Sequence, residues 1–185
     1  MSSVFGESGR GVFDVVIIGG GLVGASLAVA LGNTNKKVAL IEPHTIHSEE
    51  HSSFDERTIA LTYNAKLIFS GMGVWHAITT KKAEPIYDIH ISNKGHMGIT
   101  HLSHKDIGTD AMGYVVPSRV IGEVLWDKIH TFKNITLFNP AAAENIKQQD
   151  ENCTITISGQ KPESISGKLV AVSYTHLTLP TTSRV

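Results

Sequence analysis

The residues best placed to do chemistry in this 185-residue chain are the glycines of a short turn near the N-terminus. An apolar run, residues 15–18, leads directly into Gly19-Gly20-Gly21-Leu22-Val23-Gly24. A strand, a glycine turn and the start of a helix, in this order, are typical of the pyrophosphate cradle of dinucleotide-binding proteins. The spacing therefore predicts a nucleotide site at this turn.

Each position in the turn has a physical role. Gly19 permits the tight turn, Gly21 lets a pyrophosphate approach the backbone, and Gly24 lets the helix pack closely on the strand. Leu22 and Val23 stand at the start of the helix, where backbone N–H groups face the bound anion. We expect these five residues to contact the cofactor.

The elements on either side of the turn support this prediction. The turn is followed by a predicted helix, Ala25 to Leu31, and then by a strand, Lys37 to Ile41, which ends on Glu42. An acid at this distance from the glycines is expected to accept hydrogen bonds from the ribose hydroxyls of an adenosine, and its charge disfavours a 2′-phosphate. The alternative is an ordinary strand-to-helix turn with Glu42 as a solvated strand end.

Two arginines are further candidates for binding an anion. Arg57 follows the second strand and can pair with a pyrophosphate through two hydrogen bonds, or form a surface ion pair with Asp55 or Glu56. Arg119 lies in the first turn of a predicted helix, where a cation opposes the helix dipole. That position suggests a bound anion nearby, although a plain exposed arginine is the alternative.

The rest of the chain reads as alternating helices and strands. Trp75 is interpreted as a core anchor. Among the last strands, the first and the final one look buried and those between them look like an exposed meander. This pattern predicts a parallel sheet that the chain leaves and then re-enters. The predicted elements are a helix over 64–70, a hairpin of 86–91 with 99–102, a strand over 112–116, a helix over 117–132 with one apolar face, and short strands over 135–138, 142–147, 154–158, 164–167 and 169–172.

Composition excludes several other classes of protein. A net charge of −1 with 18% charged residues does not indicate the basic surface that nucleic-acid-binding proteins have. The single cysteine, Cys153, excludes an intrachain disulfide. The uncharged stretch 15–35 is interrupted by glycines and does not predict a membrane span. The histidines at positions 44, 47 and 51 lie in a connector without a rigid scaffold, so no metal site is predicted. With no N-terminal signal, a cytoplasmic location is expected.

Several motifs together resemble the flavoprotein aromatic hydroxylases, and within them the ubiquinone-biosynthesis branch. The resemblance runs from about residue 13 to residue 172. The glycine turn is shared by many FAD proteins, whereas the Asp-x-Arg-x-x-Ala-Leu segment and Gly-Val-Trp are much narrower signals. The motifs that carry it are residues 14–24, 54–61, 73–75 and 85–96.

The resemblance implies an α/β fold: a Rossmann-like FAD-binding domain with a parallel sheet, helices and an antiparallel β-meander. It implies FAD with its pyrophosphate over the glycine turn and its ribose on Glu42, with Arg57 and Arg119 close to the cofactor. It implies an FAD-dependent monooxygenase that uses NAD(P)H and O2 to hydroxylate a prenylated phenol. A peripheral position at the inner membrane face, or in a ubiquinone-biosynthesis complex, follows from the same resemblance.

The C-terminal end departs from the family pattern. After residue 172 the family continues into Asp-Gly and later Gly-Asp motifs, neither of which is present. We therefore expect residues 1–172 to be the N-terminal fragment of an FAD-binding domain, with 84–108 as the start of a substrate-domain sheet, and 173–185 to be a non-native or disordered tail. Such a fragment is expected to be inactive alone. The alternatives are an NAD-dependent dehydrogenase domain and a non-catalytic nucleotide-binding or interaction module.

Overall fold

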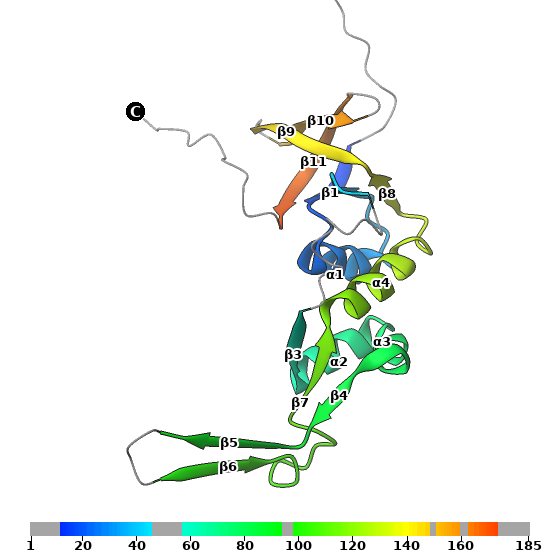
Figure 1. Cartoon of the computed structure of the whole chain (residues 1–185). Helices are drawn as coiled ribbons and strands as arrows, with labels where there is room; N and C mark the ends of the chain where they lie inside the picture. The colour runs from blue at the N-terminus through cyan, green and yellow to red at the C-terminus, as the bar shows by residue number, and fades with distance from the viewer. Residues whose placement is uncertain (1–11, 46–56, 94–97, 149–150, 160–162, 174–185) are drawn as a thin grey trace, which may run out of the picture. The chain divides into compact units, whose positions relative to one another are not determined.

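The computed structural model describes residues 12–45, 57–93, 98–148, 151–159 and 163–173 (Figure 1). The contacts divide the chain into two compact units, one made of residues 1–51 and 129–185 and the other of residues 52–128. The predicted start of a substrate-domain sheet, 84–108, lies inside the second unit together with the segments on either side of it.

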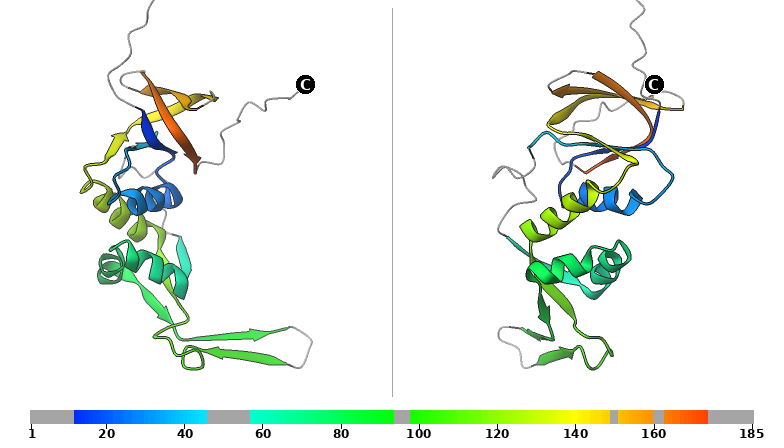
Figure 2. Two further views of the ribbon diagram at one scale, coloured as in Figure 1. Left: turned by 180° about the vertical axis from the view of Figure 1, so that it is seen from behind. Right: turned by 90° about the vertical axis from the view of Figure 1, so that its right-hand side faces the viewer.

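The first unit is built on one six-stranded sheet with the order β8-β2-β1-β11-β10-β9. β8, β2, β1 and β11 run parallel, and β10 and β9 continue the sheet antiparallel. The prediction of a parallel sheet that is left and re-entered is confirmed, and Figure 2 shows β11 beside β1. The strands are β1 (Phe13–Ile18), β2 (Val38–Ile41), β8 (Ile135–Phe138), β9 (Ala141–Gln148), β10 (Cys153–Gly159) and β11 (Glu163–Val172).

The core of this unit lies on the central strands. All four residues of β2 are buried, as expected of a short apolar strand in a parallel sheet, and helix α1 (Leu22–Leu31) contacts both β1 and β2. The meander is not an exposed one, because the alternating side chains Ile155, Ile157 and Ile165 are buried in the same core. Alternation along a strand places every second residue on one face, so half of each strand is covered.

β11 is one continuous strand, whereas the sequence suggested a break near Gly167. A Cβ atom at Gly167 would lie 2.5 Å from Cγ2 of Val16, so this glycine serves close packing of β11 on β1. A glycine inside a strand often marks such a close approach of two backbones. The two strands predicted over 164–167 and 169–172 are therefore parts of one strand.

The second unit contains a three-stranded antiparallel sheet, β3-β7-β4, and a separate hairpin, β5-β6. Helices α2 and α3 contact this sheet (Figure 1). A further helix, α4 (Ser118–Ile129), follows β7 directly. The other elements are β3 (Thr58–Thr62), α2 (Tyr63–Gly71), α3 (Trp75–Lys82), β4 (Glu84–Ile86), β5 (Asp88–Ser92), β6 (Ile99–Ser103) and β7 (Gly113–Pro117).

Predictions for this unit were partly right. The hairpin and the buried face of α4 are confirmed, the latter by Val120, Ile121, Val124, Leu125 and Ile129. The segment predicted as one strand over 86–91 is divided at Tyr87, because β4 pairs with β7 while β5 pairs with β6. Trp75 is only partly buried, and Trp126 is the fully buried tryptophan.

Within the described ranges, no helix combines the length and the apolar character needed to cross a bilayer.

Candidate functional site

The glycine turn connects the end of β1 to the start of α1. Gly19 has a φ of +97°, a conformation that favours glycine, and its N–H donates to the carbonyl of Ile41 at 2.9 Å. Gly21 caps the helix in an extended conformation, and its carbonyl accepts the N–H of Ala25 at 2.8 Å. The turn therefore ends with the helix axis directed at the carboxyl edge of the parallel sheet, where ligands of such folds bind.

The helix and the turn meet most closely at Gly24. A Cβ atom there would lie 1.9 Å from the carbonyl oxygen of Gly19 and 2.6 Å from Oγ of Ser173. Only a residue without a side chain fits this contact. The third glycine of the motif thus has the packing role that the sequence predicts.

Leu22 and Val23 are the first two helical residues of α1, and Val23 is 73% exposed. Helix geometry leaves the N–H groups of a first turn without an acceptor inside the helix. Together with the positive end of the helix dipole, amides at such a helix start are suited to hold an anion such as a pyrophosphate. The residues present at the turn fit the pyrophosphate of FAD.

Glu42 lies at the end of β2 and is only 5% exposed, so its alternative interpretation as a solvated strand end is wrong. Its Oε2 accepts the N–H of Gly20 at 2.6 Å, and its Oε1 accepts the N–H of His44 at 2.9 Å. The carboxylate is thus brought to the glycine turn, next to the position predicted for a ribose. Contact with a ribose remains a prediction.

Two side chains at this edge were missed by the sequence analysis. Asn139 donates from Nδ2 to the carbonyls of Glu42 at 2.9 Å and His44 at 2.6 Å. Ser173, at the end of the described chain, has its Oγ 2.9 Å from the carbonyl oxygen of Ile18 and 2.7 Å from that of Gly19. Asn139 is 97 residues away from Glu42 in the chain, and Ser173 is 155 residues away from Ile18. No local sequence pattern signals contacts over such separations. Residues 174–185 of the predicted tail lie outside the described residues.

Arg57 and Arg119 belong to the second unit, and strand pairing brings them to one end of its sheet. Thr58 of β3 pairs with Pro117 of β7, and the N–H of Ser118 donates to the carbonyl of Arg57 at 2.8 Å. Arg57 is exposed at this end. Its two predicted ion-pair partners, Asp55 and Glu56, lie outside the described residues.

The cation in the first turn of α4 has a partner one turn later. Nη1 of Arg119 lies 2.7 Å from Oε1 of Glu123, and Nζ of Lys81 lies 2.8 Å from Oε2 of the same carboxylate. Lys81 first, and Arg119 after it, hold the pKa of Glu123 below its ordinary value. This ion pair offsets the unfavourable placement of Arg119 in the helix dipole.

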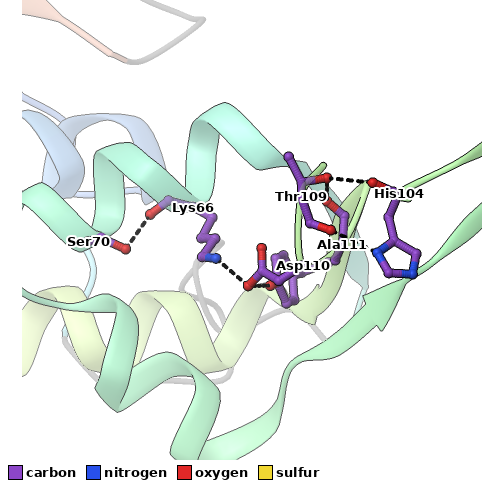
Figure 3. Close-up of polar contacts among 7 residues, drawn as sticks. Lys66, Ser70, His104, Thr109, Asp110 and Ala111 are labelled. Carbon is purple, nitrogen blue, oxygen red and sulfur yellow. Dashed lines mark hydrogen bonds and ion pairs between the residues drawn. The ribbon is translucent and has the colours of Figure 1, made fainter. Parts of the chain in front are cut away.

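A second polar cluster fixes the loop that precedes β7 (Figure 3). Nζ of Lys66 in α2 lies 2.5 Å from Oδ2 of Asp110, which also accepts the hydroxyl of Tyr114 at 3.0 Å. The hydrogen bond from Lys66 lowers the pKa of Asp110, and the hydrogen bond to Asp110 raises the pKa of Lys66. Beside it, Oγ1 of Thr109 donates to the carbonyl of Ala111 at 2.9 Å. The loop is therefore tied to helix α2.

Replacing Lys66 by methionine is expected to destabilise the second unit by about 0.5–1 kcal/mol, because the carboxylate of Asp110 is 56% exposed and such pairs are weak. Tryptophan fluorescence during urea unfolding measures this, since both tryptophans lie in this unit. In the wild type, the stabilisation by the ion pair of Lys66 with Asp110 should be fully present above the ordinary carboxyl pKa of 3.8. It should be lost as the pH falls through the lowered pKa of Asp110. Lys82→Met, at the exposed end of α3, should change neither the free energy of unfolding nor its dependence on pH.

Of the three connector histidines, His44 is described and His47 and His51 are not. In the parts of the chain that the structure describes, no group of three or more His, Cys, Asp or Glu side chains is arranged to hold a metal ion.

Comparison with known proteins agrees with this geometry. Residues 14–101 match the family model described as FAD dependent oxidoreductase. The chain is 33% identical over 162 residues to the ubiquinone biosynthesis monooxygenase COQ6, mitochondrial, of Dictyostelium discoideum, covering 80% of this chain and 32% of that protein. It is 25% identical over 162 residues to the 3-demethoxyubiquinol 3-hydroxylase of Escherichia coli, covering 85% of this chain and 40% of that protein.

Solved structures of flavin enzymes share the fold. The p-nitrophenol 4-monooxygenase PnpA of Pseudomonas putida superposes with a TM-score of 0.72 at 22% identity, covering 87% of this chain and 40% of that one. The chain spans about a third of the length of the first curated relatives it matches. The matched family model, the relatives and the geometry of the glycine turn agree: the chain is similar to FAD-dependent oxidoreductases, and its relatives include hydroxylases of ubiquinone biosynthesis.

Proposed function

We propose that this chain is the N-terminal, FAD-binding part of a monooxygenase that hydroxylates a prenylated phenol in ubiquinone biosynthesis. The observation that carries the proposal is the cradle at the carboxyl edge of the sheet. There Gly24 packs on Gly19, and Glu42 is held at the turn by Gly20. An anion-binding helix end beside a buried carboxylate suits a pyrophosphate next to a ribose.

In this proposal the cradle binds and orients the adenosine half of FAD. The amides of Leu22 and Val23 hold the pyrophosphate, and Glu42 accepts the ribose hydroxyls. Arg57 and Arg119 supply positive charge close to the cofactor, as the family resemblance implies. When bound, FAD would accept electrons from NAD(P)H and activate O2 for transfer of one oxygen atom to the phenol.

The remaining parts of the proposal concern the whole protein. The chain spans about a third of its first relatives, and we propose that residues beyond this length are needed for hydroxylation, so the 185-residue chain binds FAD weakly and does not turn over. A prenylated substrate also supports peripheral association with a membrane. Consumption of NADH or NADPH coupled to a hydroxylated phenol, by the purified chain alone, would contradict the proposed inactivity.

Titration of the purified chain with FAD, followed by quenching of flavin fluorescence, tests the cofactor assignment. Gly21→Val serves as the control, because a side chain at this position blocks the approach of a pyrophosphate to the backbone. We expect saturable binding by the wild type and at least a tenfold loss in the variant, about 1.4 kcal/mol. NADH binding that is tighter than FAD binding would instead favour a dehydrogenase. A folded chain that binds neither nucleotide would favour a non-catalytic module.

A further inference from the structure

We propose that Asn139 is a positioning residue for the adenosine half of the nucleotide, acting through the peptide groups of His44 on the carboxylate of Glu42. The inference rests on the proposed function, since it names the residue that orients the Glu42 carboxylate at the same nucleotide site. It concerns the turn between β8 and β9, which the sequence analysis did not connect with the site.

The contacts form a continuous chain from Asn139 to the glycine turn. Nδ2 of Asn139 donates to the carbonyl of His44 at 2.6 Å, and the N–H of His44 donates to Oε1 of Glu42 at 2.9 Å. The other carboxylate oxygen, Oε2, accepts the N–H of Gly20 at 2.6 Å. The segment after β2 is thus held at its backbone by one side-chain amide, and this segment in turn orients the carboxylate.

Backbone hydrogen bonds fix the position of Glu42 itself. Its N–H donates to the carbonyl of Phe138 at 3.0 Å, and its carbonyl accepts the N–H of Ala141 at 2.9 Å as well as Nδ2 of Asn139 at 2.9 Å. Loss of the Asn139 amide would leave the bonds of Glu42 to Phe138 and Ala141 in place and would remove the hydrogen bond to the carbonyl of His44. We therefore expect the effect to fall on the orientation of the carboxylate rather than on the pairing of β2 with β8.

The chain provides its own matched control at the opposite end of β8. Asn134 also donates from Nδ2 to two carbonyls, those of Leu31 at 3.0 Å and Lys36 at 2.9 Å. Because β8 and β2 are parallel, Asn134 lies at their amino ends and Asn139 at their carboxyl ends. The two asparagines make the same kind of bridge, but only that of Asn139 is made at the edge where the glycine turn lies.

The experiment compares Asn139→Asp with Asn134→Asp in the full chain. An aspartate has the shape of asparagine but cannot donate when ionised, so it places a carboxylate oxygen against two carbonyl oxygens. Titration with ADP, which carries only the adenosine half of FAD, should show about tenfold weaker binding for Asn139→Asp, as expected for loss of one hydrogen-bonded contact to a charged group. Asn134→Asp should bind ADP within about twofold of the wild type.

Two further measurements separate positioning from a general loss of stability. Combining Asn139→Asp with Glu42→Gln should weaken ADP binding by no more than the stronger single change, because residues that act through one contact are not additive. In the ligand-free chain, hydrogen exchange should accelerate at the amides of Gly20 and His44 in Asn139→Asp and stay unchanged there in Asn134→Asp. Asn139→Ala, which removes the donor without adding charge, gives the same comparison if the aspartate variant does not fold.

The outcomes distinguish this inference from the proposed function. Equal losses of ADP affinity in the two aspartate variants, or strict additivity with Glu42→Gln, would overturn it. If the wild type binds neither ADP nor FAD, the proposed function fails, and hydrogen exchange alone decides the inference. Unchanged exchange at Gly20 and His44 in Asn139→Asp would then overturn it.

Discussion

Gly24→Ala is expected to abolish measurable FAD binding and to destabilise the first unit by about 2–4 kcal/mol, as severe overpacking does. The added Cβ atom would lie 1.9 Å from the carbonyl oxygen of Gly19, which is backbone and cannot rotate away. The helix must move off β1, and the turn that cradles the pyrophosphate then loses its shape. Flavin fluorescence measures the first effect, and hydrogen exchange of the β1 and β2 amides measures the second.

Gly71→Ala is the matched control for this prediction. It makes the same change within a helix, α2, but nothing lies within 4 Å of the added Cβ atom. Alanine is the better helix former, so the control should keep its flavin affinity and be stabilised by up to about 1 kcal/mol. A Gly24→Ala chain that bound FAD like the control would show that the close contact between helix and turn is unnecessary.

The second large effect is expected at Glu42, whose replacement by alanine should weaken ADP binding by about ten- to a hundredfold, or 1.4–2.8 kcal/mol. The carboxylate oxygens that accept the N–H groups of Gly20 and His44 are removed, and the predicted ribose contact is lost with them. Selectivity is the sharper readout. The wild type should prefer ADP to 2′-phospho-ADP, since a 2′-phosphate would meet like charge.

In Glu42→Ala this preference should shrink at least tenfold, a ratio that cancels any general change in affinity. Glu144→Ala is the comparison, because this glutamate lies on an exposed part of β9. Selectivity that is the same in Glu42→Ala and in the wild type would mean that the carboxylate holds the turn but does not contact the ribose.

The sequence was sufficient for the turn because every signal there is local. The apolar strand, the three glycines and Glu42 lie within a stretch of about thirty residues, and their spacing carries the geometry. Asn139 and Ser173 reach the same edge only through pairing of distant strands, with partners 97 and 155 residues away. No spacing rule predicts which asparagine will lie beside a given carbonyl.

Helix α3 shows a different limit. Thr79 and Thr80 have side chains that weaken a helix, and the segment follows two glycines that signal a helix end. In the structure their hydroxyls donate back to carbonyls of the preceding turn, that of Thr80 to His76 at 2.8 Å. The packing of Ile78, which is fully buried, outweighs this weak local preference.

The position of β1 in its sheet bears on how the protein is made. β1 pairs with β2 on one side and with β11 on the other, and β11 begins some 150 residues later at Glu163. At about 5–20 residues per second, a ribosome takes on the order of ten seconds to synthesise the intervening chain. During that interval the strand that leads into the glycine turn has one open edge, while the second unit, the continuous segment 52–128, is synthesised in full before β11 begins. The high sequence separation of this pairing makes closure of the sheet a late and slow step, so the cradle is among the last parts of the molecule to form.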